Sequence, residues 1–310
     1  METIVFSLLN GAIYGLLLFM LSSGLTLIFS MMGVLNFAHA SFYMLGAYFA
    51  FTISETTNYW FALILAPILV GVVGMGVERW GLRKVHANGH VAELLFTFGL
   101  AYLIDEIVKI FWGRTSVNYR VPELLDFPLF TLYGAQYPAY RIFILFVAIF
   151  MLVALWYLLK KTRAGLIIQA ALSHPHMVGH LGHNVPRIFM MVFGAGCALA
   201  ALAGVIGGNY LITDPGMAVS MGPIVFVVVV VGGLGSLEGA FIAAMLIGIL
   251  QTSAISINAS LGEIFSFLGM TTTSEVGSIT IASLGPMIPF LLLVLILLVR
   301  PTGLMGDREL

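Results

Sequence analysis

The sequence predicts an all-α protein: a polytopic bundle of about eight to nine membrane-spanning helices, some of them short or broken. Hydrophobic residues make up 60% of the 310 residues and charged residues only 9%, and the mean hydropathy is +1.07. Several apolar stretches reach the roughly 20 residues that a helix needs to cross a bilayer. They lie near residues 4–29, 40–53, 60–78, 92–112, 141–159, 187–212, 223–234, 239–257 and 284–299.

The charges indicate a single transmembrane domain over residues 1–310 with a defined orientation. Two basic clusters, residues 78–84 and 160–163, are separated by two spans and must face the same side. The positive-inside rule places both in the cytoplasm, with the N-terminus outside and the C-terminus inside. The first span begins at Ile4 without a basic leader, so we interpret it as retained and not as a signal peptide. A net charge of −1 gives no basis for nucleic-acid binding.

Two spans, residues 40–53 and 223–234, are too short to cross a membrane unaided. Each adjoins a break that contains glycine, at residues 31–33 and 232–236. Such segments favour broken helices around a binding site near the bilayer midplane, where protein or water must satisfy the free backbone. The alternative is that glycines only allow close helix packing. With 34 glycines in the chain, a single one is weak evidence.

Polar side chains interrupt the apolar pattern at few places. Asn36 and His39 lie between two apolar runs and, three residues apart, project to roughly the same side. In hydrocarbon an unpaired amide or imidazole is costly, so they either form a packing contact between helices or line a translocation cavity. Asp105 and Lys109 have the i, i+4 spacing of an ion pair. Their position near a span end suits a structural role, or one in the pathway or at a subunit contact.

Two loops are long enough to have functions of their own. The outer loop, about residues 113–140, is too apolar for a disordered linker and too rich in proline for a long helix, so we expect it to pack over the bundle. The inner loop, about residues 160–186, has a helical stretch from Leu166 to Leu172. Its four histidines have no Cys, Asp or Glu beside them, so we expect no metal site there. A short amphipathic helix that docks into a soluble partner is favoured.

No motif indicates covalent catalysis. The chain lacks Gly-x-Ser-x-Gly and the phosphate-binding Gly-x-x-x-x-Gly-Lys-Ser/Thr. A single cysteine, Cys197, excludes an intrachain disulfide. We therefore expect a transport subunit and not an enzyme, with any ATP hydrolysis on separate chains.

Several motifs, taken in order, resemble a known family. They are Asn10-Gly11 with Tyr14-Gly15, residues 24–29, Asn36-Phe37-Ala38-His39 before Gly46-Ala47-Tyr48, Gly182-His183-Asn184, and residues 232–236 with Gly239-Ala240. Over nearly its whole length the chain resembles the permease subunits of branched-chain amino-acid ABC importers. The chain departs from the family pattern at two places. Ala40 stands where the family usually has glycine, and in the inner loop the family's arginine and acidic residues are replaced by Gln169, Ser173, His174 and His176.

This resemblance implies a bacterial inner-membrane importer of branched-chain amino acids or related small solutes. It implies a second permease subunit, identical or different, two cytoplasmic ATPases that bind ATP and Mg²⁺, and a periplasmic solute-binding protein, with no cofactor on this chain itself. The expected pathway residues are Asn36, His39, Gly233, Gly235 and Ser236. The expected coupling residues, within about 170–184, are Ala170, Ala171, His174, His176, Val178, Gly182 and Asn184.

The solute is open, since the family also serves urea, short amides and aromatic acids. An alternative is a secondary transporter of small polar solutes coupled to an ion gradient. It would need a buried titratable residue on its pathway, and the sequence offers His39, Asp105 and Glu106.

Overall fold

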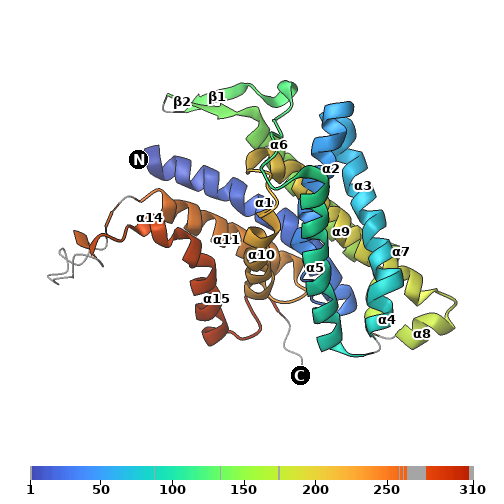
Figure 1. Cartoon of the computed structure of the whole chain (residues 1–310). Coiled ribbons are helices and arrows are strands. Elements are labelled where there is room, and N and C mark those ends of the chain that lie inside the picture. Colours follow the sequence, from blue (N-terminus) through green and yellow to red (C-terminus); the bar gives the residue numbers. More distant parts are fainter. Residues whose placement is uncertain are drawn as a thin grey trace.

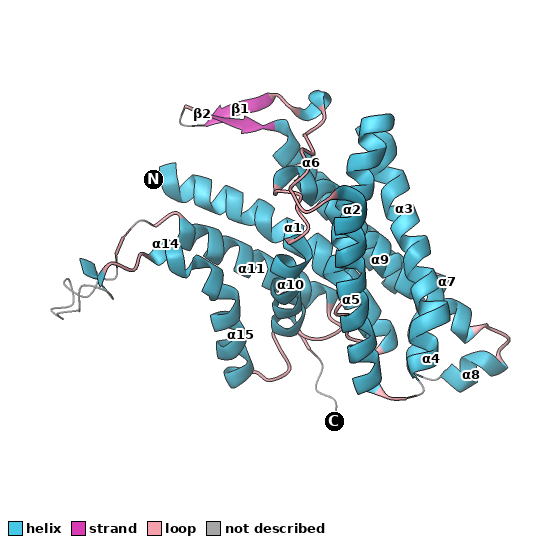
Figure 2. Cartoon of the chain, viewed as in Figure 1, coloured by secondary structure: helices cyan, strands magenta, loops and turns pink. Residues whose placement is uncertain are grey.

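The computed structural model describes residues 2–86, 88–132, 134–173, 175–257, 259–260, 262–263 and 277–306 (Figure 1). Its long helices are α1 (Glu2–Met32), α2 (His39–Thr56), α3 (Tyr59–Val77), α5 (His90–Trp112), α6 (Ala139–Lys161), α9 (Val185–Tyr210), α10 (Met217–Gly232), α11 (Leu237–Ile255) and α15 (Ile288–Val299). The shorter elements are η1 (Glu78–Leu82), α4 (Arg83–His86), η2 (Glu123–Leu125), α7 (Arg163–Ser173), α8 (Pro175–His180), α14 (Ile281–Leu284) and η3 (Gly285–Met287). The predicted all-α bundle is confirmed, and Figure 2 shows helices nearly throughout the described chain.

Each apolar stretch of the sequence corresponds to one of the long helices. Within the described residues, 6 helical segments are long and apolar enough to cross a membrane. The spans predicted to be short are indeed short. Helix α2 has 18 residues and α10 has 16, which extend about 27 Å and 24 Å at 1.5 Å per residue.

Helix α2 is the central helix of the bundle. Every residue from His39 to Tyr48 is buried, because α1, α3, α5, α9 and α10 all pack against it. A helix that is apolar all round belongs inside a protein. The surroundings of α2 are therefore other helices, which can accept polar groups that lipid would not.

Small residues set the distances between the main helices. A Cβ on Gly11 of α1 would lie 2.7 Å from the Cα of Ile249 in α11, and a Cβ on Gly46 of α2 would lie 2.4 Å from the Cα of Ala201 in α9. Real Cβ atoms do not approach backbone this closely. At these crossings the packing interpretation of the glycines is correct, as in other membrane bundles.

Both predicted helix interruptions are present. Helix α1 ends at Met32, Gly33 has φ +66°, and residues 33–38 lead into α2 without helical structure. Helix α10 ends at Gly232, and Gly233 and Gly235 have φ +105° and +85°. These left-handed conformations favour glycine because they carry no Cβ penalty.

The outer loop contains a β-hairpin that the sequence did not predict. Strands β1 (Pro128–Leu132) and β2 (Ala135–Pro138) pair antiparallel. The loop also packs against the bundle as expected, since Val117 pairs with Thr213 just after α9. Figure 1 shows the hairpin at one end of the bundle, with α4 and α8 at the other. The strands were missed because each is only 4 or 5 residues long.

Candidate functional site

The structure contains a cavity of about 450 Å³ beside the start of α2. Helices α1, α2, α5, α10 and α15 and the link between α1 and α2 line it. It is partly open, since the lining residues Tyr102 and Val219 are 62% and 71% exposed. It is lined by Leu25, Leu35, Asn36, Phe37, His39, Ala40, Ser41, Phe98, Ala101, Tyr102, Asp105, Ala218, Val219, Gly222, Pro223, Val225, Phe226, Val227, Phe290 and Leu293. A mostly apolar wall with a few polar groups is typical of small-molecule sites.

Asn36 shapes the link that leads into α2. Its side-chain oxygen accepts a hydrogen bond of 3.1 Å from the backbone N–H of Ala38, a turn that asparagine forms readily. Its Nδ2 is buried and has no hydrogen-bond partner among the described residues. With only 3% of the residue exposed, this amide is an unused donor at the cavity.

His39, the first residue of α2, is held from one side only. Its Nε2 lies 3.0 Å from the carbonyl oxygen of Leu21 in α1. Because a carbonyl only accepts, Nε2 carries the proton of this bond. Nδ1 is buried without a partner in the described part of the chain. In the neutral ring it is therefore an unused acceptor, so His39 both packs between helices and lines the cavity.

Asp105 on α5 also lines the cavity, as do Ser41 and Tyr102, and the expected pathway residues did not include it. The predicted ion pair with Lys109 is present, since the Lys109 Nζ contacts Oδ2 of Asp105. The i, i+4 spacing was the available signal. It did not show which side of α5 faces the start of α2, and that packing places Asp105 in the cavity wall.

Gly233, Gly235 and Ser236 lie elsewhere. They form the turn from α10 to α11, where the Ser236 hydroxyl accepts from the N–H of Gly239 at 3.1 Å. The chain after α15 packs on this turn, with the N–H of Met305 donating to the carbonyl of Gly232 at 2.9 Å. None of the three residues lines the cavity, so the structure does not bring them together with Asn36 and His39.

The expected coupling segment forms α7, α8 and the link to α9. The predicted helical stretch is confirmed and lies within α7. Ala171 and Val178 are buried against the chain itself, whereas four other expected coupling residues are exposed: Ala170, His176, Gly182 and Asn184. His174 lies outside the described residues. The exposed four are the ones that can contact a partner directly.

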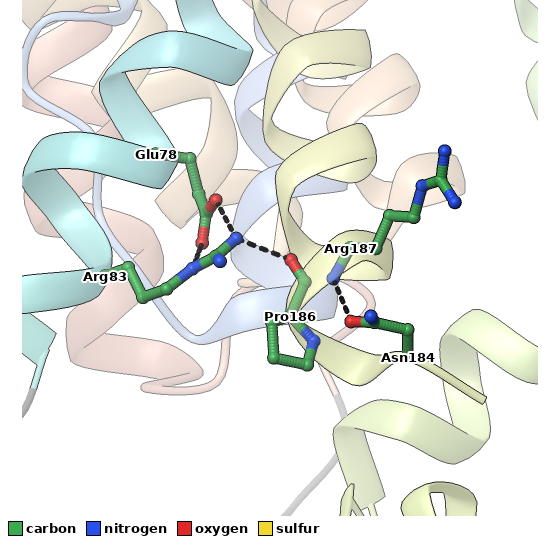
Figure 3. A network of polar contacts seen from close by, with 5 residues as sticks. All are labelled: Glu78, Arg83, Asn184, Pro186 and Arg187. Carbon is green, nitrogen blue, oxygen red and sulfur yellow. Dashed lines mark hydrogen bonds and ion pairs between the residues drawn. The ribbon is translucent and has the colours of Figure 1, made fainter. Parts of the chain in front are cut away.

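Asn184 and Arg83 fix the start of α9, directly after this segment (Figure 3). The Asn184 side chain caps α9 by accepting from the N–H of Arg187 at 3.1 Å. Arg83 donates to the Pro186 carbonyl at 2.7 Å and to both carboxylate oxygens of Glu78, at 3.1 and 2.6 Å. Glu78 and Arg83 meet because η1 is a π-helix, in which residues five apart are stacked.

Replacing Arg83 by glutamine is expected to destabilise the protein by about 1–3 kcal/mol, since Glu78 is buried and would lose its charged partner. Arg79→Gln is the matched control. It removes a charge from the same basic cluster, but the Arg79 side chain is exposed, and surface changes usually stay within about 0.5 kcal/mol. Thermal unfolding in detergent measures both. Equal shifts for the two variants would contradict this role of Arg83.

Comparison with known proteins identifies the family of the chain. Residues 7–297 match the model of the family described as the permease component of the branched-chain amino acid transport system. The chain belongs to this family. The permease is 26% identical to the high-affinity branched-chain amino acid transport system permease protein BraD of Pseudomonas aeruginosa, over 97% of this chain and 95% of BraD.

Other relatives extend the comparison. LivH of Escherichia coli, also a high-affinity branched-chain amino acid permease protein by name, is 26% identical, over 97% of this chain and 94% of LivH. The ribose import permease protein RbsC of Haemophilus influenzae is 26% identical over a smaller part, 62% of this chain and 60% of RbsC. The resemblance inferred from the sequence motifs is confirmed.

Proposed function

We propose that the permease is the membrane-spanning subunit of an ATP-driven bacterial importer for a branched-chain amino acid or a related small solute. The observation that carries this proposal is the cavity at the interrupted start of α2. There Asn36 and His39 each have a buried, unused polar atom, and most of the other lining residues are apolar. Such a site can hold a small solute by a few hydrogen bonds and release it again.

The cavity wall supports an aliphatic solute. Val219, Phe226 and Leu293 offer no hydrogen-bonding side chains, and burying the hydroxyl groups of a sugar against them would cost free energy. The relatives support this choice, because the branched-chain amino acid permease BraD matches 97% of the chain and the ribose permease RbsC of Haemophilus influenzae 62%.

The assembly that we propose contains two permeases, two cytoplasmic ATPases that bind ATP and Mg²⁺, and a periplasmic binding protein. We place the permease in the inner membrane with its N-terminus outside and its C-terminus in the cytoplasm. ATP binding would draw the ATPases together and move α8 with them. The link from α8 would pass this motion to α9, which Asn184 caps, and the bond of Arg83 to Pro186 would pass it from α9 to α4. The permease itself makes and breaks no covalent bond.

Reconstitution of the permease with its native partners tests the proposal. Labelled leucine should accumulate in proteoliposomes only with ATP and the binding protein. In this system Gly182→Trp should leave ATP hydrolysis active but abolish most uptake, because Gly182 is exposed in the expected docking segment.

Gly182→Ala is the control for backbone strain. Gly182 has φ +89°, and a Cβ added at this position would have no atom of the described chain within 4 Å. Alanine and tryptophan therefore strain the backbone alike, while only tryptophan obstructs a partner. Normal uptake by Gly182→Trp, or an equal loss in both variants, would reject docking at this turn.

A further inference from the structure

Asp105 lines the cavity, and one of its carboxylate oxygens has no hydrogen-bond partner in the described chain. Lys109 contacts Oδ2 of Asp105, and its Nζ also donates to Oε1 of Glu106 at 2.9 Å. Two carboxylates therefore share one ammonium. Oδ1 of Asp105 is buried and has no partner among the described residues. A buried carboxylate oxygen in this state is costly unless a donor or cation reaches it.

Asp105 and Asn36 are offset from each other along the helices that line the cavity. Helices α2 and α5 run parallel in register, since the N–H of Phe37 donates to Thr97 and the indole of Trp112 donates to Thr52, both with a separation of 60 residues. From Thr97, which is level with the start of α2, Asp105 lies about 12 Å further along α5 at 1.5 Å per residue. The hairpin end of the bundle is therefore nearer to Asp105.

The chemistry of the two residues differs. Asn36 presents an N–H donor beside the N-terminus of α2, which suits an anionic or carbonyl oxygen. Asp105 presents an anionic acceptor, which suits a cation. Much of the remaining wall is apolar and includes Val219, Phe226 and Leu293.

We propose that Asp105 is a specificity residue in the wall of the cavity, where its free Oδ1 accepts a hydrogen bond from the primary ammonium group of the transported solute. This proposal rests on the proposed function and adds the group by which the solute is recognised. The aliphatic part of the solute would lie along the apolar wall. Lys109 holds the carboxylate in place by its other oxygen and leaves Oδ1 without a partner in the described chain.

Glu106 distinguishes recognition from a purely structural ion pair. It shares Lys109 with Asp105, but its side chain is 58% exposed and does not line the cavity. If the carboxylates serve only to neutralise Lys109, the two residues should be similarly sensitive to substitution. If Asp105 recognises an ammonium group, only a substitution of Asp105, and not one of Glu106, should weaken the binding of amines.

The experiment uses protection of an introduced thiol in the assembled transporter. Val219→Cys places a thiol in the cavity wall, while the native Cys197 is fully buried. The rate at which N-ethylmaleimide modifies this thiol is measured at increasing concentrations of isoamylamine or of 4-methylpentanoate. Isoamylamine has an ammonium group and no carboxylate, whereas 4-methylpentanoate has a carboxylate and no ammonium group. In this parent, isoamylamine should protect. Asp105→Asn should raise its half-protecting concentration about tenfold, whereas Glu106→Gln should leave it unchanged.

Protection by 4-methylpentanoate reports on the integrity of the cavity and should be equal in all three proteins. If the Asp105→Asn protein is protected by neither compound, the Asp105→Glu protein is measured next. Asp105→Glu must then restore protection by isoamylamine, and failure to restore it rejects the proposal. Absence of protection by isoamylamine in the parent, or an equal loss in Glu106→Gln, also rejects it. Leucine uptake by the transporter without the Val219 substitution is measured separately. Failed uptake with intact protection by isoamylamine overturns amino-acid import but not recognition of the ammonium group by Asp105.

Discussion

Uptake by the permease is expected to survive largely in His39→Gln and to fall about tenfold or more in His39→Leu. Glutamine keeps a donor for the Leu21 carbonyl and an acceptor for the cavity, whereas leucine keeps neither. Each hydrogen bond lost in such a buried site is worth on the order of 1 kcal/mol, more if its partner is charged. Initial rates of leucine uptake in proteoliposomes, normalised to the amount of assembled transporter, measure the difference.

The same pair of variants separates hydrogen bonding from proton transfer. An ATP-driven importer needs no proton relay, so wild-type uptake should not follow a single histidine titration between about pH 5 and 8. Glutamine cannot titrate. If it abolishes uptake as thoroughly as leucine and the wild type shows such a titration, an ion-coupled transporter becomes the better interpretation. If neither substitution matters, His39 is a packing residue only.

The largest effect on stability is expected at the crossing of α2 and α9. A Cβ on Gly204 would lie 2.0 Å from the carbonyl oxygen of Tyr43, which belongs to the central helix. Because neither helix can move without disturbing the others, Gly204→Ala should destabilise the bundle by about 3 kcal/mol or more. The amount of monodisperse protein after heating in detergent measures this.

Gly99→Ala is the matched control for the crossing. Gly99 is also within a helix, α5, but a Cβ added there would have no atom of the described chain within 4 Å. Alanine is the better helix former by up to about 1 kcal/mol, so this variant should be as stable as the wild type or more stable. A Gly204→Ala protein that matches it would show that the crossing tolerates a larger separation.

Much of the helical architecture follows from local properties of the sequence. The apolar stretches predicted every long helix, and the glycine-rich breaks at residues 31–33 and 232–236 predicted both interruptions. The ion pair between Asp105 and Lys109 followed from their spacing on one helix. Hydropathy and spacing along one helix are properties of neighbouring residues, so no knowledge of the remaining chain was needed.

The candidate site required the tertiary structure. The sequence grouped Gly233, Gly235 and Ser236 with Asn36 and His39, because all lie at breaks in short helices. In the packed structure the second break contacts the chain that follows α15, and its residues do not line the cavity. The hairpin β1–β2 also escaped prediction, because strands this short have too few residues for an alternating pattern.

What the sequence determined by itself is therefore the family, the class of fold, the helices and their breaks, and the polar residues that an apolar environment must accommodate. What only the tertiary structure decided is which of those residues lie together. Asp105 joins Asn36 and His39 in one cavity although α2, α3, η1, α4 and more than half of α5 separate them along the chain. The reason is physical. Hydropathy is a sum over adjacent residues, whereas the side of a helix that faces a neighbour depends on close contacts such as that of Gly46 with Ala201, which form only once the whole bundle has packed.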